Sequence, residues 1–145
     1  MPLPCGPQSK LRQFGRLTAR VALLGVPALA FALPAHASAY YWSLVGTVAN
    51  RARSEWQCSR VYAVLGRAEP ALHHARRCLA LAESAPSELE EFDLPFAFEA
   101  MARAHAVAGD ESQAREWLAR ASAAGEEIGD EDDRALLAAD LATIG

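Results

Sequence analysis

The chain has few aromatic residues, 8% of 145, and few β-branched residues, although 52% of its residues are hydrophobic. Most of that hydrophobic content is alanine and leucine, which favour helices, whereas aromatic and β-branched residues favour strands. The sequence therefore predicts an all-α protein. Its length is sufficient for one domain with a modest hydrophobic core.

Acidic residues are absent from the first 50 positions, where the charged residues are Lys10, Arg12, Arg16 and Arg20. All 18 acidic residues follow, with 10 arginines, so residues 51–145 carry a net charge of −8. This acidic part lacks the clustered positive charge with which proteins neutralise phosphates. We therefore expect no nucleic acid as partner.

The apolar segment that follows the basic N-terminal residues is too short for a membrane-spanning helix. The apolar run from Val21 to Pro34 has 14 residues, fewer than the roughly 20 that a membrane-spanning helix needs. Alanines at 35, 37 and 39 then match the small-x-small pattern of a signal peptidase site. We predict that residues 1–39 are a signal peptide, cut so that the exported protein begins between residues 38 and 40, with residues 40–145 as the domain. The alternative is a cytoplasmic protein with an unprocessed or wrongly assigned N-terminus.

Two prolines support the signal-peptide interpretation. Pro27 and Pro34 would interrupt one long helix over residues 21–39, since a proline inside a helix costs about 3 kcal/mol. After cleavage, Tyr40, Tyr41 and Trp42 would form a short aromatic segment that packs on the following helices.

Only three cysteines occur, and Cys5 would leave with a signal peptide. The spacing of Cys58 and Cys78 matches no zinc motif. In an oxidising compartment these two could form a disulfide; in the cytoplasm they would be small buried hydrophobic residues. The sequence leaves both alternatives open.

Residues 59–83 and 102–126 are copies of one pattern, 43 residues apart. A fixed period of this size is typical of stacked helical repeats, in which one hairpin cannot bury its apolar face alone. The shared positions include Tyr62, Gly66 and Ala71 in the first copy and His105, Gly109 and Ala114 in the second.

Local signals place the helices. We expect them over about 48–65, 69–84, 94–108 and 111–128, with an irregular linker at 84–93 and a C-terminal capping helix after Gly129. Thr47 and Asp93 are the expected N-caps of the first and third helices. Gly66 and Gly109 are expected to end the first helix of each pair in a left-handed conformation.

The second copy resembles a tetratricopeptide repeat, and the first resembles it more weakly. The resemblance implies two stacked antiparallel hairpins over about 48–128, with repeats near the length of the kinesin-light-chain type. The signature positions of the second copy are Phe98, Met101, Ala102, His105, Gly109, Ala114, Leu118 and Ala121.

The resemblance also implies a concave groove lined by the first helix of each hairpin. A guanidinium group suits bidentate contacts with carboxylates, so an acidic peptide is the expected ligand. Arg103 alternatively forms an i,i+4 ion pair with Glu99, and Trp56 suits the core as well as the groove. The six expected groove residues are Arg53, Trp56, Arg60, Phe96, Glu99 and Arg103.

We find no pattern that predicts catalysis, a cofactor or a metal. His73 and His74 diverge by about 100° on a helix, so only one could join His105, and a metal site needs at least three ligands. We therefore expect no enzyme activity, but a module that binds a protein or peptide partner. The alternative is a homo-oligomeric subunit in which two chains stack end to end, because about three repeats are needed for stability and the sequence shows two.

Overall fold

The computed structural model describes residues 29–144. Within this range the chain forms six α-helices and one 3-10 helix and has no strand, so the prediction of an all-α fold is confirmed. The elements are α2 (Leu29–Val45), α3 (Val48–Val64), α4 (Ala68–Ser84), η1 (Pro86–Glu88), α5 (Asp93–Val107), α6 (Glu111–Gly125) and α7 (Glu131–Leu141).

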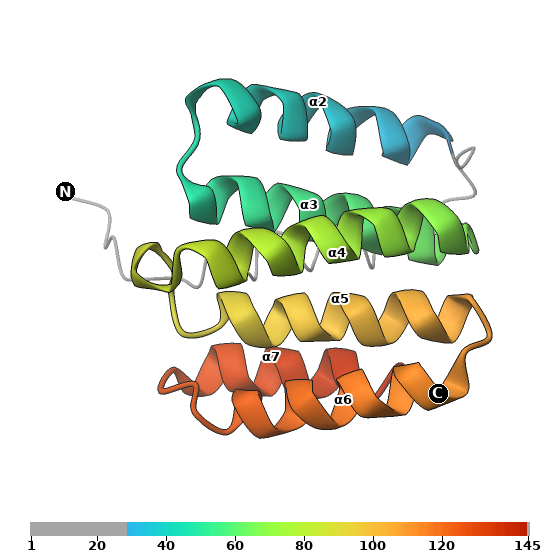
Figure 1. The fold of residues 1–145 in the computed structure, drawn as a ribbon, viewed down its shortest axis with the longest axis vertical. Coiled ribbons are helices and arrows are strands. Elements are labelled where there is room, and N and C mark those ends of the chain that lie inside the picture. Colours follow the sequence, from blue (N-terminus) through green and yellow to red (C-terminus); the bar gives the residue numbers. More distant parts are fainter. Residues whose placement is uncertain (1–28, 145) are drawn as a thin grey trace, which may run out of the picture.

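The helices lie side by side in chain order, with α2 at one end and α6 and α7 at the other (Figure 1). Contacts are most extensive between α3 and α4 and between α5 and α6. α4 packs on α5, α2 packs on α3, and α7 packs on both α5 and α6. α3 is therefore an interior helix, and α2 and α7 lie at opposite ends of the arrangement.

Caps and glycines set the helix boundaries largely as predicted. Thr47 forms a capping box with Asn50 at the start of α3. Gly66 and Gly109 have φ values of 66° and 76°, which glycine adopts without the steric cost of a Cβ. Asp93 was expected as an N-cap, but it is the first residue of α5. Its carboxylate instead accepts a hydrogen bond from the Glu90 backbone and pairs with an arginine of α3.

The aromatic segment at Tyr40–Trp42 is not separate, because it belongs to α2, which continues through Pro34. Ala32 and Ala35 of this helix pack against α3, which offsets the backbone hydrogen bond that the proline removes. The predicted cleavage positions lie inside α2, and residues 1–28 lie outside the described part. Cleavage remains a prediction. Among residues 29–144, no helix has the length and hydropathy that crossing a membrane requires.

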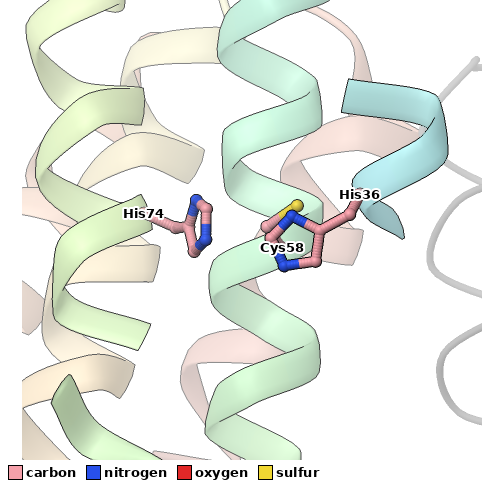
Figure 2. Close-up of side chains that lie close together, drawn as sticks. All are labelled: His36, Cys58 and His74. Atoms are coloured by element: carbon pink, nitrogen blue, oxygen red, sulfur yellow. The ribbon is translucent and has the colours of Figure 1, made fainter. Parts of the chain in front are cut away.

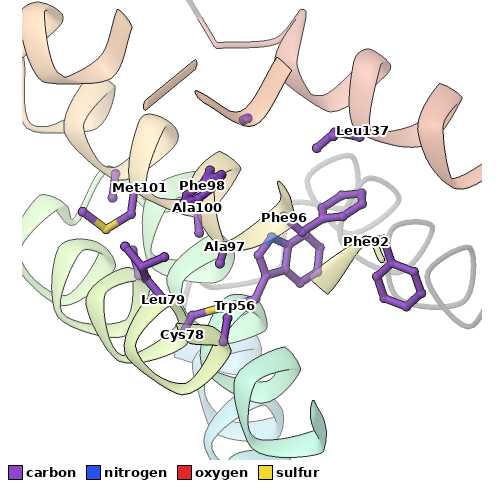
Figure 3. Packing of buried hydrophobic residues seen from close by; sticks show 14 of the residues in the cluster. Trp56, Cys78, Leu79, Phe92, Phe96, Ala97, Phe98, Ala100, Met101 and Leu137 are labelled. Carbon is purple, nitrogen blue, oxygen red and sulfur yellow. The ribbon is translucent and has the colours of Figure 1, made fainter. Parts of the chain in front are cut away.

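The main core lies between the helix pairs and combines large side chains with alanines (Figure 3). Trp56, Phe96, Met101 and Leu137 are all at most 5% exposed, and burying each such side chain contributes about 1.5–3 kcal/mol. Small residues at five positions of the two sequence copies allow the helices to approach closely. All five are buried: Ala71, Cys78, Ala102, Ala114 and Ala121.

Candidate functional site

Three of the expected groove residues, Trp56, Arg60 and Arg103, meet at the carboxylate of a fourth, Glu99. Glu99 of α5 is 0% exposed. Its Oε2 accepts a hydrogen bond from the Trp56 indole at 3.0 Å, and its Oε1 accepts bonds from Arg60 at 2.7 Å and Arg103 at 2.6 Å. The i,i+4 pair of Glu99 with Arg103 is therefore present. Glu99 is fully enclosed and serves as the acceptor that orders α3 against α5.

The second donor of each arginine is directed to the C-terminal helix. The Arg60 Nη2 lies 2.7 Å from Oδ1 of Asp140. The Arg103 Nη2 donates to the Asp140 carbonyl and to the Thr143 hydroxyl, both at 2.9 Å. The two arginines thus share the Glu99 carboxylate, and Arg60 also binds the carboxylate of Asp140, so the carboxylates that they bind belong to their own chain.

Arg53 is paired in the same way. Its Nε and Nη2 donate to the two carboxylate oxygens of Asp93 at 2.7 and 2.8 Å, and Glu90 lies 3.3 Å away. Burial alone would lower the pKa of Arg53, but Asp93 and Glu90 outweigh it and the pKa is raised. Its guanidinium group also lies over the Phe92 ring, 4.8 Å from the centroid. Arg53 is consequently a fully engaged link between α3 and α5.

Trp56 and Phe96 belong to the core. They are 5% and 3% exposed, and their rings meet edge to face with centroids 5.8 Å apart. Of the six expected groove residues, three are thus buried, and the three arginines have carboxylate partners within the chain. In this arrangement an acidic ligand would have to displace Asp140 in order to reach Arg60.

A second constellation joins three other helices. His36 of α2, Cys58 of α3 and His74 of α4 each offer one ligand atom, and these atoms lie within 4.8 Å of one another (Figure 2). Cys58 is 0% exposed, His74 is half-buried and His36 is exposed. Two imidazoles and a thiol at such separations can bind a transition-metal ion.

Glu55 orients His74. The Glu55 carboxylate lies 2.6 Å from Nδ1 of His74 and accepts a hydrogen bond from Arg77 at 2.8 Å. Burial would raise the pKa of Glu55, but the bonds from His74 and Arg77 outweigh it and the pKa is lowered. An ionised carboxylate only accepts hydrogen bonds, so Nδ1 of His74 donates to Glu55, and Nε2 is the ring nitrogen left for a metal ion.

Tyr62 contacts both histidines. Its hydroxyl lies 2.8 Å from Nε2 of His36, and its ring stacks on His74 with centroids 5.7 Å apart. Burial, with a contribution from Glu55, raises the pKa of the Cys58 thiol to about 12. Cys58 and Cys78 are both free and belong to separate buried clusters. The structure therefore has no disulfide between them.

Sequence reasoning missed this constellation for identifiable reasons. His36 was assigned to a signal peptide, and the spacing of its three residues matches no metal motif. The prediction that His73 and His74 diverge is consistent with the structure, since His73 is exposed while His74 faces Cys58. His105, which was considered as a second ligand beside His74, lies in the last turn of α5. Its Nδ1 is 3.6 Å from Oδ2 of Asp110, the N-cap of α6.

α2 also carries an apolar outer surface. Five of its side chains are more than half exposed, and we call them the α2 face: Leu33, Tyr40, Tyr41, Leu44 and Val45. Val64, at the end of α3, is another exposed apolar residue, with 58% exposure. Exposed apolar side chains gathered on one helix are often found at interaction sites.

Comparisons with known protein families, with curated proteins and with solved structures found no match. The resemblance to tetratricopeptide repeats therefore rests on the positions quoted above.

Proposed function

We propose that the protein is a protein-interaction module built from tetratricopeptide-like hairpins, α3–α4 and α5–α6, with α7 as the C-terminal cap, and that it acts by binding rather than by catalysis. The support is the coincidence of the sequence period with the helix pairs. Gly66 and Gly109 are 43 residues apart, and each lies at the turn within one pair with a positive φ.

The exposed α2 face carries this proposal. Stacked repeats need a polar outer surface on their terminal helices in order to stay soluble. α7 meets this need, since Glu131, Asp132 and Arg134 are exposed on it. α2 does not, because Tyr40 and Leu44 are 69% and 65% exposed. The end of the arrangement formed by α2 is therefore suited to receive another helix.

This proposal moves the expected contact surface away from the groove. The arginines expected to bind an acidic peptide are already paired with Asp93, Glu99 and Asp140. The α2 face has no such partner within the described residues. We infer that the partner is a protein that packs an apolar helix against α2, so that the helical stack continues.

A second copy of the chain is the alternative partner, and the difference between the two ends of the stack decides how two copies would meet. Because α7 is polar and α2 is apolar, head-to-tail stacking would pair unlike surfaces. Two copies would instead meet through α2 around a two-fold axis, which is the commonest symmetry of soluble dimers. α3, the first helix of the predicted repeats, is already covered by α2, so the contact would be made by α2.

Light scattering on the full chain distinguishes the two partners, and substitution tests the surface. The double variant Tyr40→Ser/Leu44→Ser removes apolar area from the α2 face. Val64→Ser removes exposed apolar area from the end of α3 and serves as the control. If the chain dimerises, the double variant should be monomeric while the control remains a dimer.

If the wild-type chain is a monomer, the same variants are compared in capture of host proteins by the immobilised chain. A partner retained by wild type and by Val64→Ser, but lost from the double variant, supports the module. Equal capture or equal dimerisation by all three proteins would refute the role of the α2 face.

A further inference from the structure

We propose that His36, Cys58 and His74 bind one zinc ion, through two imidazole nitrogens and a thiolate, and that this ion links α2 to the α3–α4 pair. The site lies at the junction of three helices (Figure 2). It is independent of the partner-binding function proposed above, because it concerns how α2 is held rather than what α2 contacts.

The geometry is close to that of a bound ion. Zinc binds histidine nitrogen at about 2.0–2.1 Å and cysteine sulfur at about 2.3 Å in a tetrahedral arrangement, which separates the ligand atoms by roughly 3.5 Å. The three ligand atoms here lie within 4.8 Å of one another. His36 is an exposed residue of α2, and rotation of its side chain toward Cys58 and His74 would close the remaining difference.

The surrounding side chains prepare the imidazoles for a metal. Zinc-binding histidines usually donate their other ring N–H to a carboxylate or another acceptor, which fixes the free lone pair. Glu55 performs this role for His74, and Arg77 in turn holds Glu55. The Tyr62 hydroxyl, 2.8 Å from Nε2 of His36, can accept its N–H when His36 binds through Nδ1.

The donor set favours zinc among the common metals. Magnesium and calcium prefer oxygen ligands, and the cluster offers two nitrogens and one sulfur. Blue copper sites share the two histidines and the cysteine, usually with a weak axial methionine. Met101 belongs to the main core, and the cluster around Cys58 is a separate one. A water molecule completes a tetrahedral zinc site with three protein ligands.

Proton and charge balance are straightforward. The buried thiol of Cys58 is protonated before binding, so zinc forms the Zn–S bond as the S–H bond breaks, and one proton is released to solvent. The ion with one thiolate and two neutral imidazoles has a net charge of +1. The Glu55 carboxylate, which is hydrogen-bonded to His74, partly compensates this charge.

Zinc would strengthen a small interface. The buried contact between α2 and α3 consists of Ala32 and Ala35 against Cys58 and Val61, with Ala39, Tyr62 and Leu65 at its margin. Alanine side chains bury little apolar area. An ion bound to one residue from each of α2, α3 and α4 would link all three helices directly.

The test is zinc binding by the full chain, measured by competition with a chromophoric chelator, with cobalt(II) as a spectroscopic probe. We expect one zinc per chain, a thiolate-to-cobalt charge-transfer band, and a higher melting temperature with zinc. His36→Ala is the main variant, because an exposed residue can be removed without harm to the fold, which far-ultraviolet circular dichroism verifies. Zinc affinity should fall at least about tenfold in this variant.

Two control variants match the proposed ligands in residue type, and both lie on α4, the helix of His74. His73→Ala removes the adjacent histidine, and Cys78→Ala removes the other buried cysteine. Both should retain the affinity and the cobalt band, whereas Cys58→Ala should lose the band. Glu55→Ala should weaken binding by about 10–100-fold, because His74 would lose the acceptor that orients it.

Several results would overturn the site. These are absence of zinc binding to the wild-type chain, equal binding by His36→Ala and His73→Ala, or a cobalt band that survives Cys58→Ala. Binding of copper without zinc would also refute the assignment. Finally, a mature native protein that begins at residues 38–40 lacks His36, and such a protein from the host would exclude the site from the functional form.

Discussion

Removal of the Glu99 carboxylate should be among the most destabilising single changes in this protein. Glu99 is 0% exposed and accepts hydrogen bonds from Trp56, Arg60 and Arg103. Glu99→Ala leaves the indole N–H without its acceptor and both guanidinium groups without their shared carboxylate. Removing one partner of a buried ion pair costs about 3–5 kcal/mol.

The structure places the expected cost near the lower end of that range. The side chains of Arg60 and Arg103 are each 14% exposed, and both retain contacts with the C-terminal residues. They therefore keep part of their hydration; Arg60 also keeps the Asp140 carboxylate, and Arg103 keeps the Asp140 carbonyl and the Thr143 hydroxyl. We expect Glu99→Ala to lower the free energy of unfolding by about 3 kcal/mol. Glu99→Gln keeps an acceptor for Trp56 and should cost less, about 1.5–3 kcal/mol.

Chemical denaturation followed by circular dichroism and tryptophan fluorescence measures these changes. The control is Glu111→Ala, which removes a carboxylate from another i,i+4 pair with arginine. In that pair the Glu111 and Arg115 side chains are 83% and 71% exposed, so the expected change is below about 1 kcal/mol. If Glu99→Ala were no more destabilising than Glu111→Ala, the description of Glu99 as the central acceptor between α3 and α5 would be wrong.

Two substitutions test the packing and a turn, and two measurements on the unchanged chain test the thiols and the N-terminus. Ala71→Leu should lower stability by about 1–3 kcal/mol in thermal unfolding, because Ala71 is 0% exposed and a larger side chain would separate α3 from α4. Gly109→Val should also reduce the melting temperature, since its φ of 76° disfavours a β-branched residue. Cys58 and Cys78 should resist iodoacetamide at neutral pH and react after denaturation, because burial raises the pKa of both thiols. Mass spectrometry of their peptides measures the reaction, and alkylation of the folded protein would contradict the prediction. Intact mass of the protein from its host decides whether it begins between residues 38 and 40.

Local interactions explain what could be predicted from the sequence. The all-α fold, the Thr47 cap and the turns at Gly66 and Gly109 depend on residues within a few positions of each other, so propensity and capping rules suffice to locate them. The same holds for the Arg103–Glu99 pair, which lies on one helix. The local rules were wrong at Pro34, where they predicted an interruption of the helix. The packing of α2 on α3 offsets the free-energy cost of a proline inside a helix, and this packing is not visible in the local sequence.

By itself the sequence determined the helices, the glycine turns and the 43-residue period, because each follows from short-range chemistry or self-similarity. Only the tertiary structure decided which residues meet between helices. Arg60 and Asp140 are 80 residues apart, and the His36–Cys58–His74 cluster draws on three helices. The physical reason is that contacts between helices depend on how each helix is rotated and stacked against its neighbours. That arrangement is set by the packing of the whole core, and no spacing along the chain encodes it.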